Sequence, residues 1–359
     1  MTDFGIAVVM PMHGAAAMYS PSAVATAQLA AAEENARGGV GGRAIVLHHL
    51  DGSTPDGAYL DELDALIDAG TVHAVTGSHP SFIRHALVER IAARIPYVYP
   101  SVWEGGAPEH GVFCIGETPE QQVLPALAWM AERLDVRRWC VVGDDYGWPR
   151  RTSQIVHDFL GERPNWCGEF FCDYDRLEDP ETRDAEVATL LDSITASGAD
   201  GVVMLFAGSH AAFVNRAFVE RNLDTQMLRF SPLMDETMLL ASGPEATRGM
   251  LSASSYANSL SSAAALEFQQ RYLAFHGEDA PTLSFMAASV YDAVRLTVQL
   301  ANAPTGPTTA GFEAARAGGI AYRGPRGSLS VRGARVDLEI RLFAAVACDL
   351  ELVDTLPRS

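Results

Sequence analysis

The sequence predicts an α/β protein made of two lobes, each built on a parallel sheet. Strand-like and helix-like segments alternate with short gaps from residue 4 to residue 100, as in consecutive βαβ units. The strand-like segments are continuously apolar, which is typical of strands covered by helices on both faces. The same rhythm begins again after "VFCIGETPEQQ", and 359 residues exceed one ordinary core, so we expect two domains.

The first series of elements begins near the N-terminus. Strands are expected at 4–12, 44–51, 73–77 and 97–100, and helices at 22–36, 57–68 and 80–93. The stretch "EENARGGVGGRAIVLHHLD" places its glycines after a helix and before a strand, the reverse of a phosphate-binding loop. Gly38 and Gly39 therefore indicate the end of a helix, where a left-handed backbone is needed.

The second series repeats this order. Helices are expected at 119–134, 149–161, 181–197 and 209–221, and strands in "RRWCVVGDD", "WCGEFFCDY", "GVVMLFA" and "QMLRFSP". Beyond "GMLSASSY" the pattern changes to two long helices, 261–275 and 282–301, followed by hairpin-like strands around "GPRGSLSVRGARVDLEIRLFAAV". No linker is long or polar enough to separate independent domains, so the lobes should be closely joined.

Composition excludes several functions. All 26 basic residues are arginine, which removes the lysine-dependent nucleotide loop, pyridoxal Schiff bases and Ser-Lys nucleophile pairs. The net charge of -19 would repel a phosphate backbone, so nucleic acid is not an expected partner.

The sequence predicts a cytoplasmic protein. No run approaches the roughly 20 apolar residues that cross a bilayer, so no membrane insertion is expected. The first strand-like segment, "FGIAVVMPM", follows Met1 closely, with no basic n-region or cleavage site before it. A periplasmic or extracellular protein whose signal peptide has been removed is the alternative.

The residues that commonly carry catalysis or bind metal form no recognisable motif. His48 and His49 are adjacent in a strand and would point to opposite faces, and no HExxH, CxxC or GxSxG occurs. We therefore expect no metal, no cofactor and no enzyme. An amide hydrolase that uses Asp144, Asp145 or His79 as acid or base is the rival hypothesis, although no nucleophile is evident.

Loops at the carboxyl ends of strands are the most informative segments, because open parallel sheets bind ligands there. In "GSHPSFIRHALVER", Ser78 and Pro80 suit a helix start that presents free N–H groups and the Ser81 hydroxyl; the alternative is that the serines only cap the helix. In "YVYPSVWEGG", Tyr99 and Ser101 offer hydroxyls beside an aromatic wall; the alternative is a buried aromatic cluster.

Three further loops of this kind follow, the first of them in the second lobe. "GDDYGWPRRT" carries Tyr146 and Trp148 after two aspartates, which are more typical of turn and cap residues than of catalytic acids. "SPLMDETM" carries Asp235 and Glu236, either of which could pair with a ligand cation or cap the next helix. "SASSYAN" is the last of these loops.

Taken together, these motifs resemble type I periplasmic binding proteins, over about residues 4–350. "GGVGGRAIVLHHLD" is similar to the GGVxGRxI segment of that superfamily, which closes on an acidic residue. "YPSVWEGG" and "GDDYGWPR" resemble the branch that contains urea and short-amide binding proteins and the amide sensor of aliphatic amidase operons.

The resemblance implies two Rossmann-like lobes joined by a hinge of three crossovers near 118, 249 and 330. Lobe 1 would then comprise 1–118 plus 250–329, and lobe 2 would comprise 119–249 plus 330–359, with the ligand cleft between them. By matching position, the resemblance implies ligand contacts from Ser81, Tyr99, Ser101 and Tyr146, with Trp103, Trp148, Phe206 and Met234 as walls. A ligand carboxylate would meet residues 80–82, and a ligand ammonium would meet Glu236 or Asp235.

Two departures from that branch concern the ligand. Phe206 and Met234 are bulky and apolar where the amide sensor has smaller polar residues, and His79 replaces an expected aromatic residue. The expected ligand is a short amide, a urea derivative or an amino acid, bound by cleft closure. Either a regulator protein or an ABC permease would detect the closure, and a homo-oligomer is left open.

Overall fold

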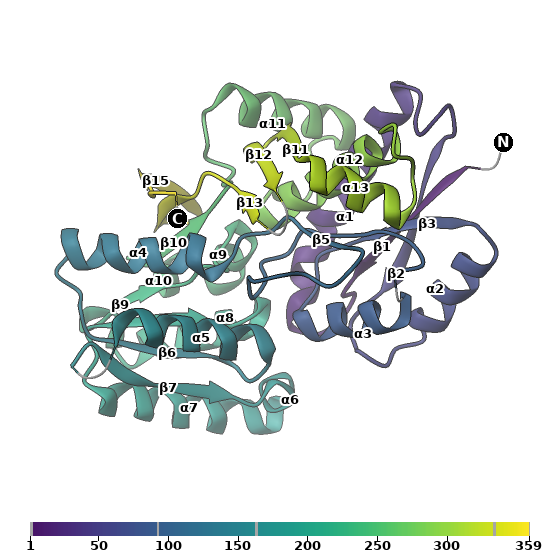
Figure 1. The fold of residues 1–359 in the computed structure, drawn as a ribbon. Helices are drawn as coiled ribbons and strands as arrows, with labels where there is room; N and C mark the ends of the chain where they lie inside the picture. The colour runs from purple at the N-terminus through teal and green to yellow at the C-terminus, as the bar shows by residue number, and fades with distance from the viewer. Residues whose placement is uncertain (1–2, 92, 162–163, 333–334, 359) are drawn as a thin grey trace. The chain divides into compact units, whose positions relative to one another are not determined.

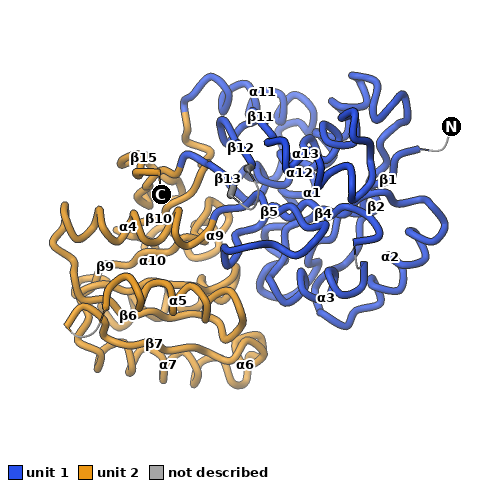
Figure 2. Tube along the Cα trace, viewed as in Figure 1, with its two compact units in different colours: residues 1–117, 261–339 blue, residues 118–260, 340–359 orange. Residues whose placement is uncertain are grey.

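The structure, a computed structural model, describes residues 3–91, 93–161, 164–332 and 335–358 (Figure 1). It confirms the predicted α/β fold with two compact units. Unit 1 comprises residues 1–117 and 261–339, and unit 2 comprises residues 118–260 and 340–359 (Figure 2). The chain therefore passes between the units three times, and each unit is discontinuous in sequence.

Unit 1 is built on a five-stranded parallel sheet in the order β2-β1-β3-β4-β5. Its strands are β1 (Phe4–Met10), β2 (Ile45–Asp51), β3 (Val72–Thr76), β4 (Tyr97–Tyr99) and β5 (Val112–Cys114). Every residue of β1 is buried, because the strand lies between β2 and β3 and is covered on both faces.

Helices cover both faces of this sheet (Figure 1). The helices of unit 1 are η1 (Ala15–Tyr19), α1 (Ser20–Ala36), α2 (Tyr59–Asp68), α3 (Ser81–Ile91), α11 (Ala263–His276), α12 (Phe285–Ala301) and α13 (Thr309–Gly318), and α11 packs on α1. Leu63 of α2 and Leu87 of α3 share a core cluster with Val9 and Val75 of the strands. On the other side, α1 packs against α12, which contacts β3 and β4.

A small antiparallel sheet completes unit 1, with strands β11 (Ile320–Gly324), β12 (Gly327–Arg332) and β13 (Arg335–Asp337). The buried Arg326 lies in the turn between β11 and β12 and holds this sheet on the unit. Its Nε donates to Asp292 Oδ2 at 2.7 Å, and its two terminal nitrogens donate to the Ile115 carbonyl at 3.2 and 3.1 Å.

Unit 2 is built on a seven-stranded sheet in the order β15-β14-β10-β9-β8-β6-β7. Its strands are β6 (Trp139–Asp144), β7 (Trp166–Cys172), β8 (Gly201–Leu205), β9 (Leu228–Phe230), β10 (Leu251–Ser254), β14 (Arg341–Val346) and β15 (Asp349–Thr355). Its helices are α4 (Pro119–Arg133), α5 (Gly147–Leu160), α6 (Tyr174–Glu178), α7 (Pro180–Ser197), α8 (Gly208–Glu220), η2 (Leu223–Thr225), α9 (Glu236–Ser242) and α10 (Pro244–Thr247).

The sheet of unit 2 differs from the expected parallel sheet at one end. Strands β6 to β10 pair in parallel, whereas β14 is antiparallel to both β10 and β15. Only Ala347 and Cys348 separate the paired ends of β14 and β15, and so short a connection joins antiparallel strands only.

The second and third crossings also differ from the expected positions, by about ten residues each. They follow residues 260 and 339, whereas the sequence indicated positions near 249 and 330. The apolar run "GMLSASSY" contains β10, which pairs with β9 and β14 and so belongs to unit 2.

The glycine-rich stretch closes a helix, as predicted. Gly38 and Gly39 have φ values of 102° and 65°, and the Gly39 N–H donates to the Glu34 carbonyl at 2.9 Å at the end of α1. A phosphate-binding role for this segment would need a helix beginning there, and none does.

Replacing Gly77, the residue after β3, should strongly destabilise unit 1. Its φ is 139°, and a Cβ there would lie 1.9 Å from the Val9 carbonyl oxygen. We expect Gly77→Ala to lower the free energy of unfolding by about 3 kcal/mol or more, measured by urea denaturation. Gly70→Ala is the matched control. Gly70 also has a positive φ, 65°, but a Cβ added there would have no atom within 4 Å, so the free energy of unfolding should fall by only about 1 kcal/mol. Equal losses in the two variants would contradict this explanation.

Candidate functional site

In unit 1, the loops that follow β1, β3 and β4 meet at one edge of the sheet, because these strands are parallel neighbours. The Ser101 hydroxyl joins two of these loops: its Oγ lies 2.9 Å from Ser78 Oγ and accepts from the His79 N–H at 3.1 Å. The Ser78 N–H donates to Met10 Sδ at 3.1 Å. Ser101 is therefore already engaged in holding the segment that leads into α3.

The Tyr99 hydroxyl is engaged in the same way, since it donates to the His79 carbonyl at 2.7 Å. The imidazole of His79 is buried beside the rings of Tyr97 and Tyr99, and the Tyr97 oxygen lies 2.8 Å from His79 Nε2. Because Nδ1 faces the Pro80 carbonyl at 3.3 Å, we assign the ring proton to Nδ1 and the acceptor role to Nε2. Burial lowers the pKa of His79 to about 3, so the ring is neutral at physiological pH.

Ser81 differs from Tyr99 and Ser101. It opens α3, exposes 3% of its surface, and its hydroxyl has no hydrogen-bond partner among the described residues. The N-terminus of an α-helix favours negative charge, because its first N–H groups lack partners within the helix. Ser81 therefore offers a buried donor at a position suited to an anion or a carbonyl oxygen.

Trp103 lies within the core cluster of unit 1, and its Nε1 has no hydrogen-bond partner among the described residues. The Arg84 guanidinium lies 5.4 Å from the Tyr99 ring centroid and 5.9 Å from that of Trp103. Arg84 also donates to Glu104 Oε2 at 2.9 Å. The Arg84 cation and the two rings thus stabilise one another. This packing is consistent with the prediction that the Trp103 ring forms a wall of the ligand site.

In unit 2, β9, β8 and β6 are consecutive parallel strands, and the predicted site residues lie at or just beyond their carboxyl ends. Tyr146 is the half-buried N-cap residue of α5, and Trp148 is buried in the first turn of that helix. Phe206 follows β8, and Met234 follows β9; both are fully buried. The sheet topology thus brings the four apolar or aromatic residues to one edge.

Asp235 and Glu236 differ in role. Asp235 caps α9, because its Oδ1 accepts from the Met238 N–H at 2.9 Å. Glu236 exposes 2% of its surface; its Oε1 accepts from the Asn258 N–H at 2.5 Å, and its Oε2 has no hydrogen-bond partner among the described residues. Burial, together with the neighbouring Asp235 charge, raises the pKa of Glu236 to about 8. Glu236 is therefore a buried carboxyl that a ligand cation would complete.

The aspartates considered as catalytic groups are both engaged. Asp145 forms two hydrogen bonds with Arg150, at 2.7 and 2.8 Å. Asp144 accepts from the Ala207 N–H at 2.7 Å, and its other oxygen lies 2.8 Å from His210 Nδ1. Sequence reasoning missed His210, although it follows a buried strand and lies in the first turn of a helix, as Ser81 does.

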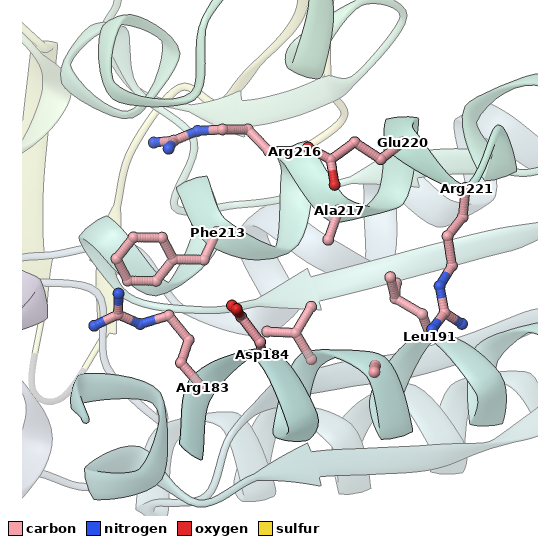
Figure 3. A pocket seen from close by; sticks show the side chains of 10 residues that line it. Arg183, Asp184, Leu191, Phe213, Arg216, Ala217, Glu220 and Arg221 are labelled. Atoms are coloured by element: carbon pink, nitrogen blue, oxygen red, sulfur yellow. The ribbon is translucent and has the colours of Figure 1, made fainter. Parts of the chain in front are cut away.

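A separate groove lies between α7 and α8 of unit 2 (Figure 3). Its lining includes Arg183, Leu191, Phe213, Arg216 and Arg221. None of the residues predicted from the sequence to bind ligand lines this groove.

Among the residues that the structure describes, no group of three or more His, Cys, Asp and Glu side chains is arranged to hold a metal ion. Within the same described ranges, no helix combines the length and the apolar character needed to cross a membrane.

Two units with parallel sheets, and polar and aromatic groups gathered at the carboxyl ends of their strands, define a solute-binding protein of the type I fold. The chain belongs to a family described as periplasmic binding protein, whose family model matches residues 4–340. No functionally curated protein matches the sequence.

Solved structures share this fold at low sequence identity. A branched-chain amino acid transporter substrate-binding protein of Streptococcus pneumoniae, in complex with isoleucine, has a TM-score of 0.78 and 18% identity, covering 98% of this chain and 100% of that one. A leucine-binding protein of Thermotoga maritima has a TM-score of 0.80 and 17% identity, covering 98% of each chain. An ABC transporter solute-binding protein of R. palustris, in complex with 4-hydroxybenzoate, has a TM-score of 0.81 and 18% identity, covering 99% of this chain and 97% of that one.

The comparisons confirm the predicted superfamily and correct the predicted location. The expectation of a cytoplasmic protein is wrong, because the family is one of periplasmic binding proteins, which are exported. That expectation rested on where the sequence begins, which carries no information about export. The assignment to the urea and short-amide branch stays a prediction.

His79 should make the folded state sensitive to acid. Unfolded chains bind a proton at this residue near pH 6.5, whereas the folded protein does not until about pH 3. The unfolded state then holds more protons between these values, so stability falls with falling pH by about 1.4 kcal/mol per unit from this group. We expect His79→Phe to reduce the slope of unfolding free energy against pH by about one proton over that range. His13→Phe is the control, because His13 is exposed; an unchanged slope in His79→Phe would contradict the assignment.

Proposed function

We propose that this protein binds an α-amino acid with an apolar side chain and delivers it to an ABC permease. Groups from both units would contact the ligand. The observation that carries the proposal is the buried Glu236 carboxyl, which has one unpartnered oxygen among the described residues.

Glu236 suits a ligand ammonium. A buried carboxylate costs several kcal/mol unless a cation and hydrogen bonds compensate it. One oxygen already accepts the Asn258 N–H, so a cation at the other would complete its partners. Asp235 is committed to capping α9, which leaves Glu236 as the better candidate of the two.

The start of α3 suits the ligand carboxylate. The Ser81 hydroxyl is buried without a partner among the described residues, and it lies where the helix favours negative charge. Tyr99 and Ser101 would act mainly by holding the 78–81 segment, because their hydroxyls already bind it. Tyr99 and Ser101 were first expected to contact the ligand directly, and in this proposal they support the segment that does so.

An apolar ligand side chain fits the remaining groups. Trp148, Phe206 and Met234 are buried and apolar at the sheet edge that also carries Glu236. The related proteins of Streptococcus pneumoniae, in complex with isoleucine, and of Thermotoga maritima, a leucine-binding protein, bind ligands of this class.

Ligand binding would favour a closed arrangement of the units. The proposed ammonium partner lies in unit 2 and the proposed carboxylate partner lies in unit 1. Only a state that brings both to one ligand makes both sets of contacts, so the ligand shifts the population toward that state. A permease would then detect the closed form, and no bond-making step is involved.

A neutral short amide is the second candidate, and the same residue favours it. With a pKa of about 8, Glu236 is mostly protonated at pH 7 and could donate its proton to an amide oxygen. The hydrolase hypothesis has less support, because Asp144, Asp145 and His79 all have partners within their own units.

Proton release separates the amino acid from the amide. An ammonium ion beside Glu236 would lower its pKa, so binding of leucine or isoleucine at pH 7 should release up to about 0.9 proton. Titration calorimetry in two buffers of different ionisation enthalpy measures this number directly. A neutral amide such as acetamide should release almost none.

Glu236→Gln should weaken amino acid binding and abolish the proton release, because the glutamine side chain cannot ionise. Glu245→Gln is the matched control, since Glu245 is exposed on α10 and should leave both quantities unchanged. Leucine binding without proton release would reject the Glu236 contact. Binding of amides in the absence of amino acid binding would favour the second candidate.

Ser81→Ala should weaken ligand binding by about 1 kcal/mol or more while leaving the melting temperature of the free protein nearly unchanged. The hydroxyl makes no hydrogen bond in its unit among the described residues, so its removal costs the fold little. Ser328→Ala, at an exposed position of β12, is the control. Unchanged affinity in Ser81→Ala would remove the start of α3 from the site.

A further inference from the structure

A fully buried histidine follows the loop of Phe206 in unit 2 and contacts Asp144, two residues before Tyr146. His210 is in the first turn of α8 and exposes 0% of its surface. Its Nδ1 lies 2.8 Å from Asp144 Oδ1, and its Nε2 lies 3.3 Å from Glu178 Oε1, at ion-pair distance but without hydrogen-bond geometry. Burying a polar side chain whose two ring nitrogens face carboxylates costs free energy of folding unless hydrogen bonds to its neighbours compensate it.

Three groups face the imidazole from two elements. Asp144 approaches from β6, while Glu178 and Tyr174 approach from α6, with the Tyr174 ring centroid 4.7 Å from that of His210. Cys172 interacts electrostatically with Asp144, and Asp175 interacts electrostatically with Tyr174. Among the described residues, these side chains form no group that could hold a metal ion.

Asp144 connects this histidine to two of the proposed ligand loops. One carboxylate oxygen faces His210, and the other accepts the Ala207 N–H at 2.7 Å. Phe206 immediately precedes Ala207, and Tyr146 follows Asp144 by two residues. The His210–Asp144 contact therefore ties the loop after β6 to the loop after β8.

Helix α6 supplies the second connection. The Tyr174 ring lies edge-on to that of Tyr146, with centroids 6.2 Å apart. Arg183 of α7 holds the end of α6, because it donates to the Leu177 and Glu178 carbonyls at 2.7 and 2.8 Å. Its guanidinium also lies 3.9 Å from the Phe213 ring centroid, beside the groove in Figure 3. Helix α6, which carries Tyr174 and Glu178, is thus held in place by contacts that do not involve His210.

We propose that His210 is the positioning residue of the ligand site in unit 2: its bond to Asp144 sets the place of Tyr146 and Phe206. The expected effect of His210 on ligand affinity rests on the proposed function. Its structural part concerns the free protein and can be tested without any ligand. His210 would not contact the ligand itself.

Two isosteric substitutions separate the Asp144 contact from the rest of the ring. His210→Asn retains a side-chain N–H donor near the position of Nδ1, so it can still bind Asp144. His210→Gln places its amide near the position of Nε2 and loses that bond. Both side chains are polar and no larger than the ring, and His157→Gln, at a partly exposed position of α5, is the matched control.

The position of Tyr146 can be read directly by fluorine NMR, with a single 3-fluorotyrosine placed at Tyr146 in the full chain. In the free protein, we expect His210→Gln to shift or broaden this resonance, and His210→Asn and His157→Gln to leave it close to the wild-type position. The affinity for leucine, measured by calorimetry, should fall about tenfold or more in His210→Gln and remain within about threefold in His210→Asn.

Each outcome decides one of the two proposals. An unchanged resonance in His210→Gln, or equal changes in His210→Gln and His210→Asn, would overturn the positioning role. A changed resonance with unchanged leucine affinity would also overturn it, because the loops would then not govern binding. If the wild-type protein binds no amino acid, the proposed function fails, while the resonance of the free protein still decides whether His210 positions Tyr146.

Discussion

The parallel pairing of neighbouring strands is the constraint on which the site depends. In unit 1, β3 pairs with both β1 and β4, and in unit 2, β8 pairs with both β6 and β9. Parallel strands end at the same edge of a sheet, so residues that are far apart in sequence are gathered there without any further device. The loop after β3 meets the loop after β4, and Asp144 meets Ala207 across 63 residues of sequence.

Burial of polar groups then decides which of these residues can act on a ligand. A buried donor or acceptor is stable when it has a partner, and costs about 1–3 kcal/mol when it does not. Ser101 and Tyr99 meet this requirement within unit 1, which makes them part of the scaffold. Ser81 and Glu236 do not meet it fully among the described residues, which is why they carry the proposed contacts.

At one edge of the unit 2 sheet, some acidic side chains hold the loops in place, while another is proposed to bind the ligand. Asp145 is neutralised by Arg150, and Asp144 is enclosed by the Ala207 N–H and His210, so both acids stabilise their loops. Glu236 lies two strands away without a cation among the described residues. Both oxygens of Asp144 and of Asp145 have partners, whereas Glu236 Oε2 has no hydrogen-bond partner among the described residues, and this oxygen makes Glu236 the proposed binding carboxylate.

The sequence by itself determined most helices and strands of the two α/β series, the stop at Gly38 and Gly39, and the superfamily; short elements such as α6 and β5, and the helix α13, were not predicted. These features depend on local chemistry: apolar runs, cap residues and the freedom of glycine to adopt positive φ. It also identified the loops that carry Ser81, Tyr146 and Glu236, since each loop follows a buried strand directly.

Only the tertiary structure decided which groups in those loops are occupied. Tyr99 binds a carbonyl 20 residues away and Asp144 faces a histidine 66 residues away, and no local pattern records such pairs. The third crossing and the antiparallel end of the unit 2 sheet were decided in the same way, because strand pairing is chosen by burial against distant strands. Physical contact between residues remote in sequence, and not residue type, separates the proposed ligand groups from the supporting ones in this protein.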